Sequence, residues 1–307
     1  MVTDMTKPCV TVLMSVFNGQ IYLKEAIDSI LNQTYTNFEF VIINDASTDD
    51  SEQIIHSYHD KRIKYSKNHI NLGLAASLNK GINLSSGEYI ARMDADDISI
   101  NTRLARQVDF LEENPHIVLV GSWFKIIGSG YIVKPPTSKE DVKIDILFNN
   151  PLAHPSVMFR KQDFVNQNLY YDETLNTSQD QELWYRVSKE LEIANMPQVL
   201  LNYRVHDNQV SSAKKEIQRK NRYLIKKKII SDFLGDKLGA KGFAKFISLK
   251  ADEKYSFFPL SIWIVLLRLY FRNKKKKVYD EAKFNARLIF LLKKSIIQNQ
   301  FLPWKSL

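Results

Sequence analysis

Three carboxylates stand close together at Asp94, Asp96 and Asp97, directly after an apolar run at residues 89–93. Carboxylates so near one another repel, so without a cation the pKa of at least one of them should rise. A hard divalent cation such as Mg2+ or Mn2+ prefers oxygen ligands, and it can neutralise charge on a departing diphosphate. The cluster therefore predicts a metal site. The alternative is a strand end followed by a helix cap, because Asp is a favoured N-cap residue.

Two further polar segments follow apolar runs earlier in the chain. Ser15, Phe17 and Asn18 end the first run, and an aromatic ring in such a place can stack on a nucleobase. Asp45 follows the second run, where its carboxylate can accept a hydrogen bond from a base N–H. Simpler explanations stay open for both segments. Asn-Gly is a common turn, and the Ser-Thr pair after Asp45 can cap a helix.

The elements that carry these residues follow a regular rhythm. Four apolar, β-branched runs at residues 10–16, 38–44, 63–66 and 89–93 start 28, 25 and 26 residues apart. Residues 22–32, 50–59 and 74–84 between them have apolar side chains at helical spacing. This alternation predicts βαβ units and a mostly parallel sheet. Ligands bind beyond the carboxyl ends of such strands, so the three polar segments should lie at one edge of the sheet.

A different pattern begins after residue 101. Helices are expected at residues 102–113, 141–148 and 181–189, and short strands at 117–121, 131–133, 157–160 and 199–205. From residue 214 on no strand is expected, and residues 214–234 and 281–299 resemble basic helices. We therefore expect a front half at 1–100, a second half at 101–213 and a helical extension at 214–307.

Composition narrows the class of protein. Hydrophobic residues make up 44% and charged residues 25% of the chain, an ordinary globular balance. The single cysteine, Cys9, cannot form an intramolecular disulfide, which fits a reducing compartment. Residues 1–8 lack the pattern of a secretory signal. Residues 214–307 hold 24 Lys and Arg against 7 Asp and Glu, whereas the rest of the chain is acidic. Such an extension indicates an anionic partner, either a membrane surface or a nucleic acid.

One segment of the extension, residues 257–271, is largely apolar but contains Pro259 and Arg268. It is too short for a membrane-spanning helix, which needs about 20 apolar residues. Its many aromatic side chains, followed by Arg272 and four lysines, resemble an interfacial anchor on anionic lipid. The alternative is a core helix that packs on the front of the chain. We expect no nucleic acid, because the sequence has no stacking platform interleaved with its basic residues.

Five ordered segments of the front half, at residues 11–18, 22–34, 41–49, 71–75 and 87–97, together resemble the inverting family 2 glycosyltransferases. That family has the GT-A fold, a three-layer α/β sandwich with a mostly parallel central sheet, here followed by a C-terminal helical extension. The resemblance implies that Phe17 and Asp45 contact the base, usually uracil. It also implies that Asp94 lies near the ribose or sugar and that Asp96 holds the metal. Ser15, Asn18 and Asp97 are assigned to the same donor site.

The resemblance continues more loosely in the second half. His154, Pro155 and Ser156 begin a segment similar to one beside the sugar site of the family. Residues 202–211 are similar to the closing Tyr-Arg-x-His segment of the family. Arg204 and His206 within it can donate hydrogen bonds to a diphosphate, although a lone histidine is more often structural.

Residues 178–184 look like the Glu-Asp-x-x-Leu-Trp stretch whose Asp is the general base of the family. That alignment implies Asp180 as the base, with Gln179 at the position of the first acidic residue. Glu182 is the fallback base, and Trp184 lies either beside the acceptor or in the core. Asp180 can also be a helix N-cap. An inverting transfer needs a carboxylate that takes the acceptor's proton while another group stabilises the leaving diphosphate. Asp180 follows Asp96 by 84 residues, so the fold can place the two on opposite sides of the sugar.

The expected reaction moves one sugar from a nucleoside diphosphate, in the usual case uridine, to a saccharide acceptor with inversion, assisted by Mg2+ or Mn2+. Residues 1–100 would bind the nucleotide-sugar, and residues 101–213 the acceptor. The acceptor is expected to be carried on a lipid diphosphate, in the assembly of a bacterial surface polysaccharide such as O-antigen or capsule. The protein would then be cytoplasmic and peripheral on the inner face of the cell membrane.

Two other classes of protein remain open. A nucleotidyltransferase usually has a Gly-rich loop with Arg or Lys after its first strand, which residues 15–19 lack. A family member that only binds nucleotide-sugar is the second alternative, and Gln179 is the one feature that favours it.

Overall fold

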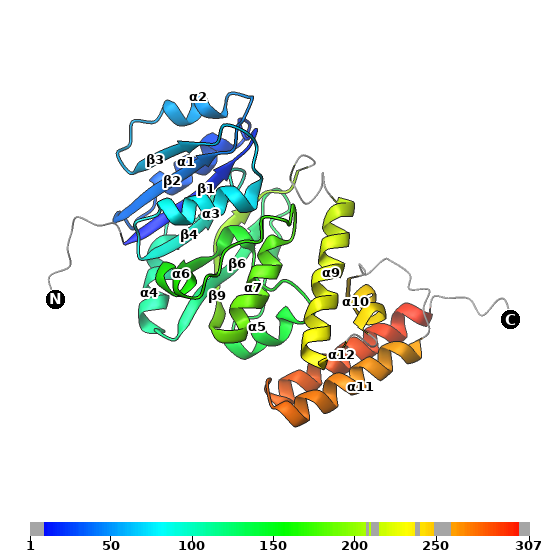
Figure 1. Cartoon of the computed structure of the whole chain (residues 1–307). Helices are drawn as coiled ribbons and strands as arrows, with labels where there is room; N and C mark the ends of the chain where they lie inside the picture. Colours follow the sequence, from blue (N-terminus) through cyan, green and yellow to red (C-terminus); the bar gives the residue numbers. More distant parts are fainter. Residues whose placement is uncertain (1–8, 207–208, 210–214, 237–239, 249–258, 301–307) are drawn as a thin grey trace.

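The computed structural model describes residues 9–206, 209, 215–236, 240–248 and 259–300, in which a nine-stranded sheet is covered by helices and followed by a helical extension (Figure 1). The strands are β1 (Val10–Val16), β2 (Phe38–Asn44), β3 (Ile63–Lys67), β4 (Tyr89–Met93), β5 (Ile98–Ser99), β6 (Ile117–Ile126), β7 (Ile132–Val133), β8 (Met158–Arg160) and β9 (Glu192–Tyr203). Their order is β3-β2-β1-β4-β8-β6-β9-β5, and β7 pairs with β6.

The front half is built from parallel strands joined by helices, as its sequence predicts. β1 pairs in parallel with both β2 and β4, and β2 pairs in parallel with β3. The connecting helices are α1 (Leu23–Leu31), α2 (Ser51–His56) and α3 (Leu74–Leu84). Val12 and Met14 lie in one hydrophobic core and Leu13 in the other, because successive side chains of a strand point to opposite faces of the sheet. The carboxyl ends of β1, β2 and β4 therefore meet at one edge.

The second half of the sheet is mixed rather than parallel. β8 lies antiparallel between β4 and β6, whereas β6 and β9 run parallel and β5 is antiparallel to β9. The helices of this half are α4 (Arg103–Glu113), α5 (Lys139–Ile146), α6 (Lys161–Asn166) and α7 (Gln179–Glu190), with a 3-10 turn at His154–Ser156. The two halves share one continuous sheet, with parallel pairs among the front strands and between β6 and β9, and antiparallel pairs where β5, β7 and β8 join.

Strand β9 is longer than its sequence suggests, because it begins at Glu192 rather than at residue 199. Pro197 and the polar side chain of Asn195 interrupt the apolar pattern there. Asn195 is buried, and its Nδ2 donates to the carbonyl oxygens of Pro136 and Pro151 at 2.8 and 3.0 Å. These tertiary hydrogen bonds satisfy the Nδ2 group of Asn195, which would otherwise oppose burial of the strand, whereas its Oδ1 has no hydrogen-bond partner among the described residues.

The extension consists of helices in all its described parts, as predicted: α9 (Lys215–Leu234), α10 (Ala240–Ser248), α11 (Pro259–Lys276) and α12 (Glu281–Gln300). α9 contacts α7, and α12 contacts α5, so the extension packs on the second half of the sheet domain (Figure 1). Ile262, Val265, Leu266 and Leu269 of α11 are buried, at the spacing of one helix face. None of the helices in the described parts of the chain combines the length and apolarity that crossing a membrane requires.

One face of α11 is buried, but its main contacts are with α9, α10 and α12 and not with the front of the chain, where the core-helix alternative placed it. Its opposite face remains exposed, with Trp263, Ile264, Leu267 and Phe271 at the surface. Residues 257 and 258, which belong to the same apolar run, lie outside the described residues.

Candidate active site

The acidic cluster lies directly after β4, at the carboxyl edge of the parallel strands. One carboxylate oxygen each from Asp94, Asp96 and Asp97 lies within 4.8 Å of the others. Asp97 is fully buried, and its Oδ1 accepts a hydrogen bond of 2.8 Å from the backbone N–H of Arg204. Its Oδ2 has no hydrogen-bond partner among the described residues. A buried carboxylate oxygen without a partner is costly, and a cation is the group that would relieve it.

The electrostatics of the cluster support the same conclusion. Burial, followed by the negative charge of Asp94, raises the pKa of Asp96, and burial raises the pKa of Asp97 well above its ordinary value. A divalent cation would bring these pKa values down by favouring the ionised carboxylates. The residues present therefore fit Mg2+ or Mn2+, as the sequence predicts for Asp96.

Arg92, which sequence reasoning missed, contacts the acidic cluster from β4. It is buried on β4 and forms an ion pair with Asp94. Its Nε and Nη1 have no hydrogen-bond partner in the described part of the chain. Burial raises the pKa of Asp180 and lowers the pKa of His154, and the positive charge of Arg92 opposes the first shift and adds to the second. Arg92 therefore acts electrostatically on both halves of the site.

The segment after β9 folds back onto the acidic cluster. His206 Nε2 lies 2.8 Å from Asp96 Oδ2, and Arg204 Nε donates to the backbone oxygen of Asp96 at 2.8 Å. Arg204 also pairs with Glu25 Oε2 at 2.6 Å and lies over the ring of Tyr22. The structure thus brings both residues to the predicted donor site, although their contacts are with the cluster and with α1. His206 is placed where its imidazole nitrogen can join Asp96 in holding a cation.

The ends of β1 and β2 form the other side of this edge. Phe17 is 52% exposed, so its ring is free to stack on a ligand. Asn18 has a left-handed backbone with φ 51°, and its Oδ1 accepts from the backbone N–H of Thr48 at 2.9 Å. Its own N–H donates to Ser47 Oγ at 3.0 Å. The two strand ends are thereby tied together, while Ser15 is half-buried on β1.

Asp45 is more deeply placed than Phe17. It is buried, and its carboxylate accepts from the backbone N–H groups of Leu72 and Gly73 at 2.9 and 2.8 Å and from Asn68 Nδ2 at 2.8 Å. These bonds hold the loop that leads into α3, so a base contact at Asp45 would share oxygens that already accept hydrogen bonds.

Asp180 lies in the first turn of α7 and is half-buried. Asn150 Nδ2 donates to its Oδ2 at 2.7 Å. Burial raises the pKa of Asp180, although hydrogen bonds from the Gln181 backbone and from Asn150 offset part of the rise. A carboxylate of raised pKa is a better proton acceptor near neutral pH. Asn150 was missed in the sequence, where the Asn-Asn-Pro run at 149–151 indicates only a turn.

The remaining candidates form a packed wall rather than an open surface. His154 Nε2 lies 2.8 Å from the hydroxyl of Tyr171, and Trp184, which is fully buried, contacts both rings. Pro155 and Ser156 are also buried. Trp184 therefore has the core position that was one of its two expected places.

Glu182 has partners of its own. It forms ion pairs with Arg186 at 2.8 Å and with Lys228 of α9 at 3.5 Å. The structure does not bring it together with Asn150 and Asp180, and its contacts are those of a residue that fixes α9 to α7.

Comparison with known proteins agrees with this geometry. The family described as glycosyl transferase family 2 matches residues 11–176. An uncharacterized glycosyltransferase of Haemophilus influenzae is 36% identical over 287 residues, covering 88% of this chain and 83% of its own. One of Methanocaldococcus jannaschii is 39% identical over 228 residues, covering 70% of this chain and 78% of its own. The chain belongs to the family 2 glycosyltransferases.

Solved structures share the fold. Staphylococcus aureus TarS 1-349 in complex with UDP-GlcNAc has a TM-score of 0.65 at 17% identity, covering 95% of this chain and 93% of its own. The mannosyltransferase PcManGT of Pyrobaculum calidifontis, in complex with GDP-Man and Mn2+, has a TM-score of 0.59 at 16% identity, covering 97% and 89%. The fold is thus the GT-A fold with a helical C-terminal region, as the sequence predicts.

Proposed function

We propose that this glycosyltransferase is metal-dependent and inverting, and that it moves a sugar from a nucleoside diphosphate, most simply UDP, to a saccharide acceptor. The observation that carries the proposal is the acidic cluster, in which a buried oxygen of Asp97, close to Asp96 and His206, has no hydrogen-bond partner in the described part of the chain. The front half of the domain, residues 1–100, binds the donor, with Phe17 against the base. The second half, residues 101–213, binds the acceptor.

The metal site consists of Asp96, with Asp94, Asp97 and His206 beside it. A divalent cation there would neutralise charge on the departing diphosphate. Arg92 holds Asp94 in place through their ion pair. The backbone N–H of Arg204 donates to the Asp97 carboxylate and its Nε donates to the backbone oxygen of Asp96, so the Asp97 carboxylate and the Asp96 backbone are fixed before the donor arrives.

Asp180 is the general base in this proposal. Its carboxylate takes the proton of the acceptor hydroxyl as that oxygen attacks the anomeric carbon of the donor. The bond from the anomeric carbon to the diphosphate oxygen breaks with its electron pair, and the configuration inverts. Asn150 orients the carboxylate through the bond to Oδ2.

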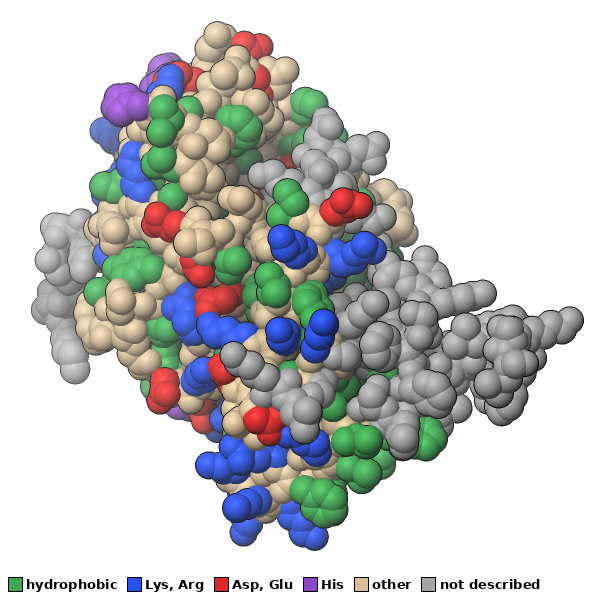
Figure 2. Space-filling view, turned by 45° about the vertical axis from the view of Figure 1, so that its right-hand side comes forward, with side chains coloured by type: hydrophobic (Ala, Val, Ile, Leu, Met, Phe, Trp, Pro, Cys, Tyr) green, Lys and Arg blue, Asp and Glu red, His purple; other side chains and the backbone are tan. Residues whose placement is uncertain are grey.

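The exposed face of α11 supports peripheral attachment to an anionic membrane. Trp263, Ile264, Leu267 and Phe271 are 40, 49, 57 and 62% exposed, and the lysines at 274–277 follow them. Hydrophobic side chains gather beside a basic cluster at the lower end of the molecule (Figure 2). Apolar side chains beside lysines fit the boundary between headgroups and acyl chains. We place the enzyme on the inner face of the cell membrane, acting on a lipid-linked acceptor for a surface polysaccharide.

Co-sedimentation tests the membrane proposal. Wild type should pellet with phosphatidylglycerol-containing vesicles, and a Trp263→Ser, Leu267→Ser double variant should stay in the supernatant. Leu84→Ser is the matched control, because Leu84 is 50% exposed on α3. Equal pelleting of the double variant and wild type would remove α11 from the proposal.

Release of nucleoside diphosphate tests the activity. UDP-glucose, UDP-galactose, UDP-GlcNAc and GDP-mannose are each incubated with the protein and Mn2+, and slow hydrolysis of at least one is expected even without acceptor. Asp96→Ala should abolish it. Hydrolysis that survives Asp96→Ala or the removal of divalent cations contradicts the assignment, as does no hydrolysis of any donor.

A further inference from the structure

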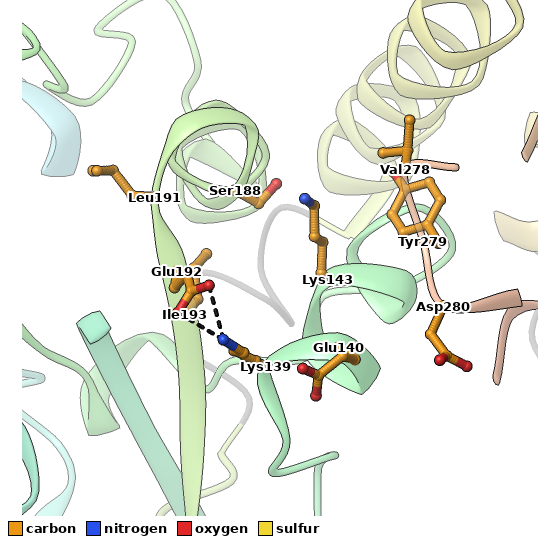
Figure 3. A pocket seen from close by; sticks show the side chains of 10 residues that line it. All are labelled: Lys139, Glu140, Lys143, Ser188, Leu191, Glu192, Ile193, Val278, Tyr279 and Asp280. Carbon is orange, nitrogen blue, oxygen red and sulfur yellow. Dashed lines mark hydrogen bonds and ion pairs between the residues drawn. The ribbon is translucent and has the colours of Figure 1, made fainter. Parts of the chain in front are cut away.

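Two hollows lie where the extension meets the sheet domain. The smaller, of about 300 Å³, lies between α5, the start of β9 and the α11–α12 connection (Figure 3). Its Lys139 already pairs with Glu192 at 2.9 Å, and none of the candidate site residues lines it. The larger, a groove of about 680 Å³, has one wall from the sheet domain and one from α12. Its volume is within the range of small-ligand sites, about 300–1,000 Å³.

One end of the groove adjoins the candidate base. Asn150, an exposed residue that lines the groove, donates the 2.7 Å hydrogen bond to Asp180 Oδ2. The backbone oxygen of neighbouring Asn149 accepts from Gln181 Nε2 at 3.3 Å, which ties the same loop to the first turn of α7. A molecule in the groove that contacts Asn150 is therefore separated from the Asp180 carboxylate, its proposed proton acceptor, by the Asn150 side chain alone.

The other wall comes from α12. Phe290 is 54% exposed, and the guanidinium of Arg287 lies 5.3 Å from the centre of its ring. Arg287 forms an ion pair with Asp145 on the opposite wall, and its buried Nε has no hydrogen-bond partner among the described residues. Lys283 donates to Asp141 Oδ2 at 3.1 Å. Lys283 and Arg287, the two cations of α12 that line the groove, are thus already paired with carboxylates of α5.

This chemistry suits a sugar chain better than a free phosphate. The lining joins an exposed aromatic ring to planar amide, carboxylate and guanidinium groups. An aromatic ring packs against the apolar face of a sugar ring, and planar groups can bond two neighbouring hydroxyls. A diphosphate would have to compete with Asp141 and Asp145 for Lys283 and Arg287.

We infer that the groove is an acceptor subsite, and that side chains of α12 in the extension contact the acceptor and help to select it. A saccharide of two or more units lies along it, with the accepting hydroxyl at Asp180 and a following unit between Asn149 and Phe290. The inference rests on the proposed glycosyltransferase reaction and adds the minimum length of the acceptor and the surface that binds it. The extension then takes part in substrate choice, in addition to any membrane contact.

Binding of the full chain to a printed glycan array tests this inference, followed by titration of the best glycan. Phe290→Ala should weaken binding of that glycan about tenfold, whereas Phe290→Tyr should keep it. Ile289→Ala is the matched control, because Ile289 is 53% exposed next to Phe290 but does not line the groove. Arg287→Lys, which keeps the charge but loses the planar fork, should also weaken binding.

Hydrolysis of nucleotide-sugar, measured on the same preparations, separates the two proposals. Equal hydrolysis by all four variants and wild type, with only Phe290→Ala and Arg287→Lys impaired in glycan binding, supports the subsite. If wild type hydrolyses donor but binds no glycan on the array, the acceptor-subsite inference is wrong. It is also wrong if Phe290→Ala binds the glycan with the affinity of wild type. Absence of hydrolysis in wild type would instead count against the reaction itself.

Discussion

Replacing Asp180 with Asn tests whether Asp180 is the general base while the acidic cluster binds the donor. The two side chains have nearly the same volume, and the Asn oxygen can still accept the hydrogen bond that Asn150 donates. The fold and the donor site should therefore be unchanged, while the proton acceptor is lost. General base catalysis contributes about 100- to 10,000-fold to a rate. The activation free energy should therefore rise by about 3–5 kcal/mol.

The assay compares two rates on the same preparation. Transfer to acceptor should fall by the stated factor in Asp180→Asn, whereas the KM for the donor should change less than about threefold. Glu182→Gln is the control from the same helix turn, because Glu182 is held by Arg186 and Lys228. It should keep its rate of transfer and lose only stability. The reasoning fails if Asp180→Asn transfers at more than a tenth of the wild-type rate, or if Glu182→Gln loses as much.

Three further predictions concern the pH dependence of kcat, the stability contributed by Glu39, and the close packing at Gly87. Burial raises the pKa of Asp180, so the fall of kcat on acidification should begin at a higher pH than it would for an ordinary Asp. Asn150→Ala removes a hydrogen-bond donor to the ionised carboxylate, so it should shift the pH profile of kcat to still higher pH. Burial alone would raise the pKa of Glu39, but hydrogen bonds from its neighbours outweigh it and lower the pKa to about 2. Its stabilising contribution is therefore present above the ordinary Glu pKa and lost as pH falls toward 2. Urea unfolding should show Glu39→Gln less stable by about 2–3 kcal/mol at pH 7, and a constant deficit down to pH 2 would contradict this. A Cβ on Gly87, in the bend before β4, would lie 2.5 Å from the backbone nitrogen of Thr11 on β1, so Gly87→Ala should lower the free energy of unfolding by about 1–3 kcal/mol. Unchanged urea unfolding would show that this bend does not approach β1 so closely.

The front half of the fold was predictable because β1, β2 and β4 are buried along almost their whole length. In residues 38–44, for example, five of the seven side chains are apolar and all seven residues are buried. The carboxyl-edge rule then placed Phe17, Asp45 and Asp96 at one edge before any contact was known. The strands of the second half were harder to predict. Buried Asn195, for example, is tolerated within β9 because it donates hydrogen bonds to the carbonyl oxygens of Pro136 and Pro151, which are distant in the sequence.

The parts of the site that were missed share a physical cause. Arg92 is an arginine inside an apolar strand, and the sequence does not indicate that its guanidinium turns toward Asp94. Asn150 lies in a turn 30 residues before Asp180, and only tertiary packing joins them. The contact of His206 with Asp96 spans 110 residues for the same reason. Motifs therefore predicted the groups that we propose to react, and the fold was needed to find the residues that contact them.

The C-terminal helices carry two proposed roles on different surfaces. The outer face of α11 offers apolar side chains and lysines to a membrane, whereas Arg287 and Phe290 of α12 line the groove beside Asn150. A saccharide that enters along the groove would meet Asp180 after passing α12.

Binding of Mn2+ in the presence of UDP tests the central claim most directly, because that claim places the metal and diphosphate at Asp94, Asp96 and Asp97. Free Mn2+ is measured by its paramagnetic resonance signal as protein is added, with and without UDP. We expect wild type to bind Mn2+ more tightly when UDP is present, and Asp96→Ala to lose that effect while it unfolds at the same urea concentration. UDP-dependent Mn2+ binding that is equal in Asp96→Ala and wild type would contradict the account.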